Sequence, residues 1–147
     1  GFRIMKDGAH TDATTAEIFA GRRVALFAVP GAYTKTCHLK HLPGFLDAIE
    51  EFKRKGIDTV ACTAVNDLYV LTQWGKDTGA DGRILMLADG NAAFAKAIGM
   101  DSESGTLGVR SKRYAMLVED GVVKTFNVEP TTGKAEVSSA EELLKAL

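Results

Sequence analysis

The fold is decided by residues 22–29, RRVALFAV, which run into Pro30 and Gly31. A short run of apolar and partly β-branched residues that ends at turn signals predicts a strand buried on both faces, as at the centre of a parallel sheet. The loop residues 32–36 come next, and then Cys37, where apolar side chains begin to recur at helical spacing. We therefore expect Cys37 near the N-terminus of a helix that follows a central strand.

Helices are predicted on both sides of this strand. The apolar pattern that begins at Cys37 is interrupted by Pro43 and Gly44, where we expect a kink or a restart of the helix. Upstream, residues 14–21 predict a short helix, because Thr14 and Glu17 have the spacing of a capping box.

Further along the chain, strand-like and helix-like segments alternate. Residues 57–65 and 83–88 are β-rich, and each is followed by a helical pattern, over residues 67–77 and 92–98 respectively. The first of these helices is predicted to begin through Asn66, a favoured capping residue. Alternation of this kind predicts parallel strands joined by crossover helices.

The C-terminal part of the chain predicts an antiparallel hairpin and a closing helix. Residues 113–119 and 122–128 flank Asp120 and Gly121, which form the strongest short hairpin signal in the chain. A helix is expected from about Ala140, preceded by a second capping-box spacing. The sequence therefore predicts an α/β fold, with a mixed central sheet flanked by helices on both faces.

Composition limits the classes of function. A chain of 147 residues with 46% hydrophobic and 25% charged residues predicts one soluble domain over residues 1–147. The net charge of −1 gives no general attraction for nucleic acid or for a membrane, and the longest apolar stretch, residues 24–30, is too short to cross a bilayer. Two cysteines argue against a secreted disulfide framework, so we expect a reducing compartment, the cytoplasm first.

The loop after the first strand carries a recognisable signature. Pro30, Thr34 and Cys37 follow the pattern Pro, three residues, Thr, two residues, Cys, and residues 41–44 read His-Leu-Pro-Gly. The pattern resembles the peroxiredoxin signature, and its continuation resembles the type II, or five-type, subfamily. This resemblance implies a thioredoxin-like fold and a thiol-dependent peroxidase that needs no cofactor and no metal. The other segments that resemble the subfamily, in chain order, are residues 65–67, 91–94, 105–108, 112–114 and 118–121.

The resemblance also implies roles for four residues. Only a thiolate attacks an O–O bond, so the site must favour the anionic form of Cys37, and a helix N-terminus contributes to that. Arg113 would add a fixed positive charge, and with the Thr34 hydroxyl it would polarise the peroxide as negative charge develops on the leaving oxygen. Pro30, which lacks an N–H, would wall the sulfur off from bulk water.

The second cysteine bears on the reductant. Cys62 lies in a β-rich run, where a thiol usually behaves as a small apolar residue of the core. Some relatives have a resolving cysteine before the last helix, but residues 131–139 contain none. The sulfenic acid formed on Cys37 would therefore be reduced by an outside thiol, which the resemblance gives as glutathione with glutaredoxin, or thioredoxin. The resemblance further implies a homodimer.

Other interpretations remain open at this stage. Relatives commonly have Pro where this chain has Lys35. This departure favours the alternative function, a redox sensor or binding protein on the same scaffold. A thiol-disulfide oxidoreductase normally has Cys-x-x-Cys, whereas residues 34–37 read Thr-Lys-Thr-Cys. Positions three or four apart share a helix face, so Cys37, His38 and His41 could be considered as metal ligands, but a metal site would need further ligands, and we interpret His41 as shaping the helix start.

Overall fold

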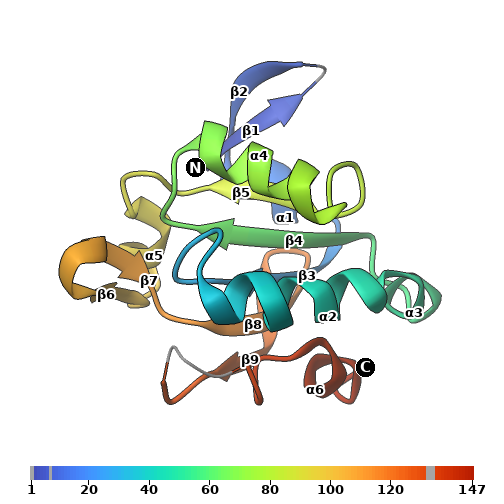
Figure 1. The fold of residues 1–147 in the computed structure, drawn as a ribbon. Coiled ribbons are helices and arrows are strands. Elements are labelled where there is room, and N and C mark those ends of the chain that lie inside the picture. Colours follow the sequence, from blue (N-terminus) through green and yellow to red (C-terminus); the bar gives the residue numbers. More distant parts are fainter. Residues whose placement is uncertain (1, 7, 132–134) are drawn as a thin grey trace.

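The computed structural model describes residues 2–6, 8–131 and 135–147. Its centre is a seven-stranded mixed sheet in the order β2-β1-β5-β4-β3-β8-β9 (Figure 1). Three neighbouring strands are parallel, namely β3 (Arg23–Ala28), β4 (Thr59–Ala64) and β5 (Leu85–Ala88). Antiparallel pairs extend this block on both sides, through β1 (Phe2–Lys6), β2 (Ala9–Ala13), β8 (Tyr114–Glu119) and β9 (Val122–Val128).

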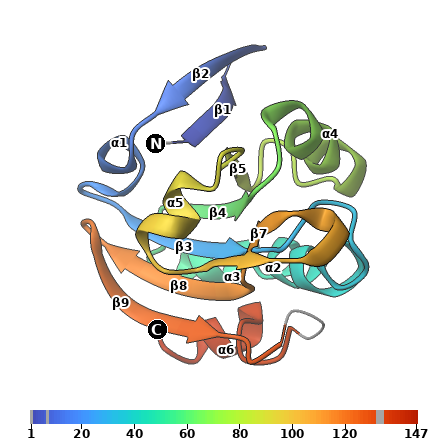
Figure 2. The same cartoon turned by 90° about the vertical axis from the view of Figure 1, so that its left-hand side faces the viewer.

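Helices cover both faces of the sheet, as the turned view shows clearly (Figure 2). One face carries α1 (Thr15–Phe19) and α5 (Ala93–Ala97). The other face carries α2 (Leu42–Asp47), α3 (Ile49–Arg54), α4 (Leu68–Thr78) and α6 (Ala140–Leu144). Among the described residues, no helix combines the length and the apolarity that crossing a bilayer requires. The predicted α/β layout, a mixed sheet between two helical layers, is confirmed.

Strand β3 is the buried central strand that the sequence predicts. Val24 and Leu26 pack into the core under α1 and α5, whereas Ala25 and Phe27 pack into the core under the other four helices. Each face of the strand thus meets its own apolar cluster, as expected for a run without polar alternation. The strand leads directly into the loop that carries Cys37.

The helix after this loop begins with an irregular turn. Residues Cys37–His41 form a π turn, labelled η1, closed by a hydrogen bond from the Leu42 N–H to the Cys37 carbonyl. Helix α2 then starts at Leu42 with Pro43 in its first turn, where a residue without an N–H is tolerated. The expected restart near residues 43 and 44 therefore lies slightly earlier, and a second break, at Ala48, was not predicted.

The other predicted helix boundaries and turns mostly agree with the structure. The side chains of Thr14 and Ser139 cap α1 and α6 as expected. The prediction of Asn66 as the cap of α4 was wrong: Asp67 accepts the hydrogen bond from the first turn of that helix. Two short elements, β6 (Asp101–Glu103) and β7 (Val109–Ser111), form a separate hairpin joined by the 3-10 turn η2 (Gly105–Leu107).

Candidate active site

The sulfur of Cys37 lies between two hydrogen-bond donors. The Arg113 guanidinium donates from Nη2 to Sγ over 2.9 Å, and the Thr34 hydroxyl lies 2.9 Å from the same atom. Cys37 is 0% exposed and Arg113 is 2% exposed, so both groups are shielded from water. Hydrogen bonds from a cation and a hydroxyl to one sulfur are stronger in such a buried site than they would be in bulk solvent.

Neighbouring strands bring the sulfur and the guanidinium together. In the antiparallel pair of β3 and β8, Ala28 lies opposite Tyr114, so the loop that leaves β3 and the residue that precedes β8 meet at one end of the sheet. The loop is held there by a hydrogen bond from the Ala32 N–H to the Asn66 side chain, over 2.9 Å. Asn66, displaced from its predicted capping role, thus positions the loop.

Thr34 lies beside the sulfur of Cys37, and Pro30 lies at the start of the same loop. The Thr34 Oγ1 is 2.7 Å from the Gly31 carbonyl oxygen and 2.9 Å from Cys37 Sγ. A hydroxyl has one proton to donate, so a thiolate at Cys37 draws that proton to the sulfur, whereas a thiol leaves it to the carbonyl. Pro30 is buried at the start of the loop, and Lys35 is exposed.

Tyr33 attaches the loop to α4, a contact that the sequence did not predict. Its backbone has a positive φ of 64°, a strained conformation for a non-glycine residue. Its hydroxyl donates to the Asp77 carboxylate over 2.6 Å, and this hydrogen bond, followed by slight desolvation and by the negative charge of Asp77, raises the pKa of Tyr33 to about 12. A second contact joins α4 to the π turn η1: the Trp74 indole N–H donates to His38 Nδ1 over 2.9 Å.

His41 contacts the guanidinium directly, a role that goes beyond the predicted shaping of the helix start. Its Nδ1 lies 2.8 Å from Arg113 Nη1, while its ring packs against Phe27 and Phe45 at centroid distances of 5.0 and 5.5 Å. Burial among these rings, and then the Arg113 charge, lowers the pKa of His41 to about 3. The imidazole is therefore neutral at physiological pH.

Cys62 is buried in the centre of the sheet, as predicted. It pairs with Phe27 of β3 and Met86 of β5, inside the larger apolar cluster. Burial raises the pKa of its thiol well above the ordinary value, the negative charge of Cys37 adds to that effect, and the Arg113 charge opposes it. Across residues 2–6, 8–131 and 135–147, no group of three or more His, Cys, Asp or Glu side chains could hold a metal ion.

A mixed sheet flanked by helices, with a thiol just after its central strand, is the layout of a thioredoxin-like protein, and comparisons with known proteins support this class. The family model described as Redoxin matches residues 3–144. A solved structure of reduced Prx3 in complex with H2O2 from Vibrio vulnificus superposes with a TM-score of 0.94 at 44% identity, covering 99% of this chain and 91% of that one.

Sequence relatives narrow the family. Peroxiredoxin-2E-2, chloroplastic, from Oryza sativa is 48% identical over 146 residues, and Peroxiredoxin-2E, chloroplastic, from Arabidopsis thaliana is 46% identical over 138 residues. These matches cover 96% and 91% of this chain but 64% and 58% of the two relatives. The chain belongs to the type II peroxiredoxins of the redoxin family.

Proposed function

We propose that the chain is a thiol-dependent peroxidase that reduces hydrogen peroxide and small alkyl hydroperoxides. One observation carries this proposal: Cys37 Sγ has both the Arg113 guanidinium and the Thr34 hydroxyl 2.9 Å away. The two donors stabilise the thiolate in the resting site, and they also lie where a peroxide oxygen next to the sulfur would develop negative charge. Arg113 and Thr34 would therefore stabilise first the attacking thiolate and then the leaving oxygen of the peroxide.

The proposed reaction is a two-electron displacement. The Cys37 thiolate attacks one peroxide oxygen, an S–O bond forms as the O–O bond breaks, and the other oxygen takes up a proton and leaves as water or as an alcohol. The peroxide is reduced, and the sulfur is oxidised to a sulfenic acid. Arg113 and Thr34 stabilise the leaving oxygen, and Pro30 helps to exclude water. The similar Prx3 from Vibrio vulnificus was solved in complex with H2O2, which supports this choice of substrate.

We further propose that an outside thiol restores Cys37. The buried position of Cys62 and the absence of cysteine from residues 131–139 support a one-cysteine cycle. The outside thiol forms a mixed disulfide with Cys37, and a second thiol releases the reduced enzyme. Glutathione with glutaredoxin, or thioredoxin, has the chemistry required.

Access of this reductant requires movement of the first helical turn, which begins at Cys37. Because Cys37 is 0% exposed, a molecule as large as glutathione reaches Sγ only when the first turn of the helix opens. That turn is the π turn η1, a rare helical form that occurs mostly as single turns, frequently at functional sites.

The homodimer stays a proposal as well, supported by exposed apolar side chains on the elements next to the site, namely Tyr33, Leu39, Tyr69, Val70, Leu107 and Val109.

The test is peroxide consumption with an added thiol. We expect wild-type protein to consume many equivalents of hydrogen peroxide when glutathione and glutaredoxin, or thioredoxin, are present, whereas Cys37→Ser consumes none. Cys62→Ser is the matched control and keeps the activity. Intact mass after peroxide treatment should show one added oxygen on wild-type protein and a glutathione adduct when glutathione follows.

Two results would contradict the peroxidase. Equal consumption by wild-type protein and Cys37→Ser would remove Cys37 from the chemistry. A single stoichiometric oxidation of Cys37, without turnover by any of these thiols, would favour the redox sensor instead.

A further inference from the structure

The guanidinium of Arg113 is held by a partner on each side. Nη2 donates to Cys37 Sγ over 2.9 Å, and Nη1 donates to His41 Nδ1 over 2.8 Å. Arginine has no acceptor, so Nδ1 of His41 must be the acceptor in this pair. The proton of the neutral imidazole is therefore on Nε2, which lies 2.9 Å from the Ser138 carbonyl oxygen and donates to it. The tautomer of His41 is fixed from both sides.

Ser138 is in turn fixed by the buried carboxylate of Glu129. The Ser138 N–H and hydroxyl both donate to Glu129 Oε2, over 2.7 and 2.6 Å. Ser138 is 0% exposed and Glu129 only 6% exposed, so water does not compete for these two short hydrogen bonds. Both hydrogen bonds reach the same oxygen, Oε2, and they give the pair one arrangement, whereas Oε1 is buried and has no hydrogen-bond partner among the described residues.

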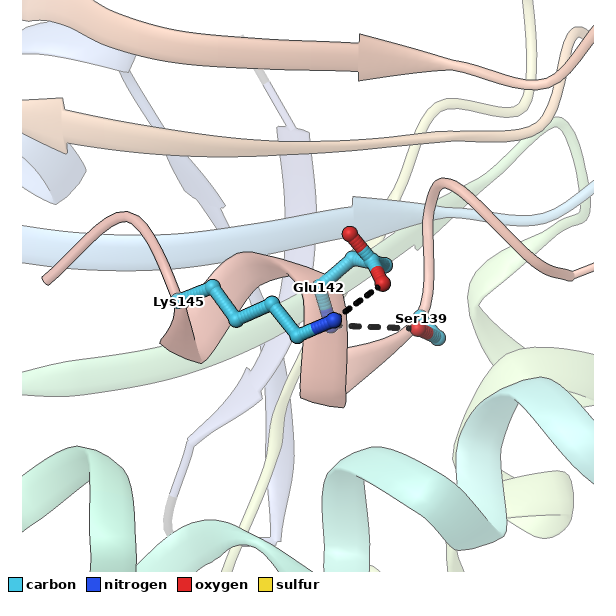
Figure 3. Close-up of polar contacts among 3 residues, drawn as sticks. All are labelled: Ser139, Glu142 and Lys145. Carbon is cyan, nitrogen blue, oxygen red and sulfur yellow. Dashed lines mark hydrogen bonds and ion pairs between the residues drawn. The ribbon is translucent and has the colours of Figure 1, made fainter.

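The segment that follows Ser138 is also held in place. Ser139 caps helix α6: its hydroxyl accepts from the Glu142 N–H over 3.2 Å, and the Glu142 carboxylate in turn contacts Lys145 (Figure 3). The carbonyl that orients His41 thus lies between the hydrogen bonds to Glu129 and the capped helix α6. This local order allows Ser138 to act as a rigid acceptor.

Glu129 also lies next to Arg113 through the main chain. Its N–H donates to the Arg113 carbonyl oxygen over 3.0 Å, which extends the pairing of Tyr114 with Val128 by one residue pair. The contacts therefore close a ring: Arg113 to His41, His41 to Ser138, Ser138 to Glu129, and Glu129 back to Arg113. Every member of this ring is buried.

We propose that Glu129 and Ser138 are positioning residues for the guanidinium of Arg113, acting through His41. The inference rests on the proposed peroxidase, in which Arg113 must be aimed at the sulfur and at the breaking O–O bond. An error of about 1 Å in such a group costs on the order of a hundredfold in rate. The C-terminal segment before α6, which touches neither sulfur nor peroxide, thereby contributes to the rate of peroxide reduction.

The test compares two reactions of Cys37 in the Glu129→Ala variant. The second-order rate constant for oxidation by hydrogen peroxide should fall by between about tenfold and a hundredfold, because the leaving oxygen loses an aligned donor. Alkylation by iodoacetamide, which has no leaving oxygen to stabilise, should fall much less. Glu129→Gln keeps an acceptor oxygen for Ser138 and should recover most of the peroxide rate, and Glu141→Ala, on the exposed surface of α6, is the matched control.

The tautomer of His41 reports directly whether the closed set of contacts among Arg113, His41, Ser138 and Glu129 is intact. With only three histidines in the chain, nitrogen NMR can resolve its imidazole, and we expect the Nε2–H form in wild-type protein and a mixture in Glu129→Ala. Ser138→Ala, which removes only the hydroxyl, replaces Glu129→Ala in both measurements if that variant does not fold.

The outcomes separate this proposal from the proposed function. Wild-type peroxide rates in the Glu129 variant with an unchanged His41 tautomer would overturn the positioning role, and so would an equal fall in both reactions of Cys37. A wild-type protein that reacts slowly with peroxide contradicts the proposed peroxidase instead. In that case the His41 tautomer in the Glu129→Ala variant still tests whether Glu129 and Ser138 orient His41.

Discussion

Cys37 and Cys62 are equally buried, but their surroundings differ. Both are 0% exposed, and both belong to the same apolar cluster. Cys62 lies in the middle of β4, and burial raises the pKa of its thiol. Cys37 lies at the end of a loop, where Arg113 and Thr34 reach its sulfur. Burial by itself therefore makes a thiol inert, whereas burial together with a cation and a hydroxyl makes a site for an anion.

The largest effect is expected when the cation is removed from Cys37. In Arg113→Met, the second-order rate constant of Cys37 with hydrogen peroxide should fall by about a hundredfold to a thousandfold, the range found when one donor to a developing oxyanion is lost. Stopped-flow oxidation of wild-type and variant protein measures this constant. Lys112→Met, a change at the exposed neighbouring position, is the control and should react at the wild-type rate. A fast Arg113→Met protein would mean that burial alone distinguishes the two cysteines.

A smaller effect is expected from the hydroxyl. Thr34→Val preserves the shape of the side chain but cannot donate to Cys37 Sγ, so we expect the peroxide rate constant to fall by about tenfold, the size of one hydrogen bond to a charged group. Thr34→Ser keeps the donor and should remain within a few-fold of wild type. If Val and Ser at this position give the same rate, the 2.9 Å contact does not contribute to the reaction.

The smallest effect concerns Cys62 and appears in stability. The unfolded thiol ionises near its ordinary pKa of 9.0, while the folded thiol, whose pKa is raised, keeps its proton. The folded state then binds more protons, so the free energy of unfolding falls as pH rises above that value. Urea titrations across this pH range should show a shallower fall for Cys62→Ala. Val60→Ala, on the same strand, should lower stability at every pH without changing the slope.

Much of the fold could be predicted because its signals are local. The unbroken apolar run of β3 and the turn residues Asp120 and Gly121, which adopt positive φ values of 48° and 78°, determine their own conformations. The β1–β2 and β6–β7 hairpins were missed because most of their side chains are exposed or half-buried, so no alternating pattern marks them. The capping error at Asn66 arose because Asn66 and Asp67 are both good caps, and only the tertiary contact with Ala32 separates them.

The candidate site also contains residues that local sequence predicts and residues that it does not. Cys37, Thr34 and Pro30 are close in sequence and were predicted from their match to a local family signature, whereas Arg113 was assigned from its position in the family, without a local motif. The contacts of His41 with Ser138 and of Ser138 with Glu129 join side chains far apart in the chain, and no local pattern encodes them. The π turn at Cys37 was not predicted either, because the apolar spacing after Cys37 fits an ordinary α-helix equally well.

The pairing of Ala28 with Tyr114 links the register of two strands to the geometry of the site. Side chains alternate along a strand, so a slip of one residue between β3 and β8 would send the Arg113 side chain to the opposite face of the sheet. A misaligned molecule would carry the same sulfur without its cation. The contact between the sulfur and the guanidinium thus depends on the register of two strands that are far apart in the sequence.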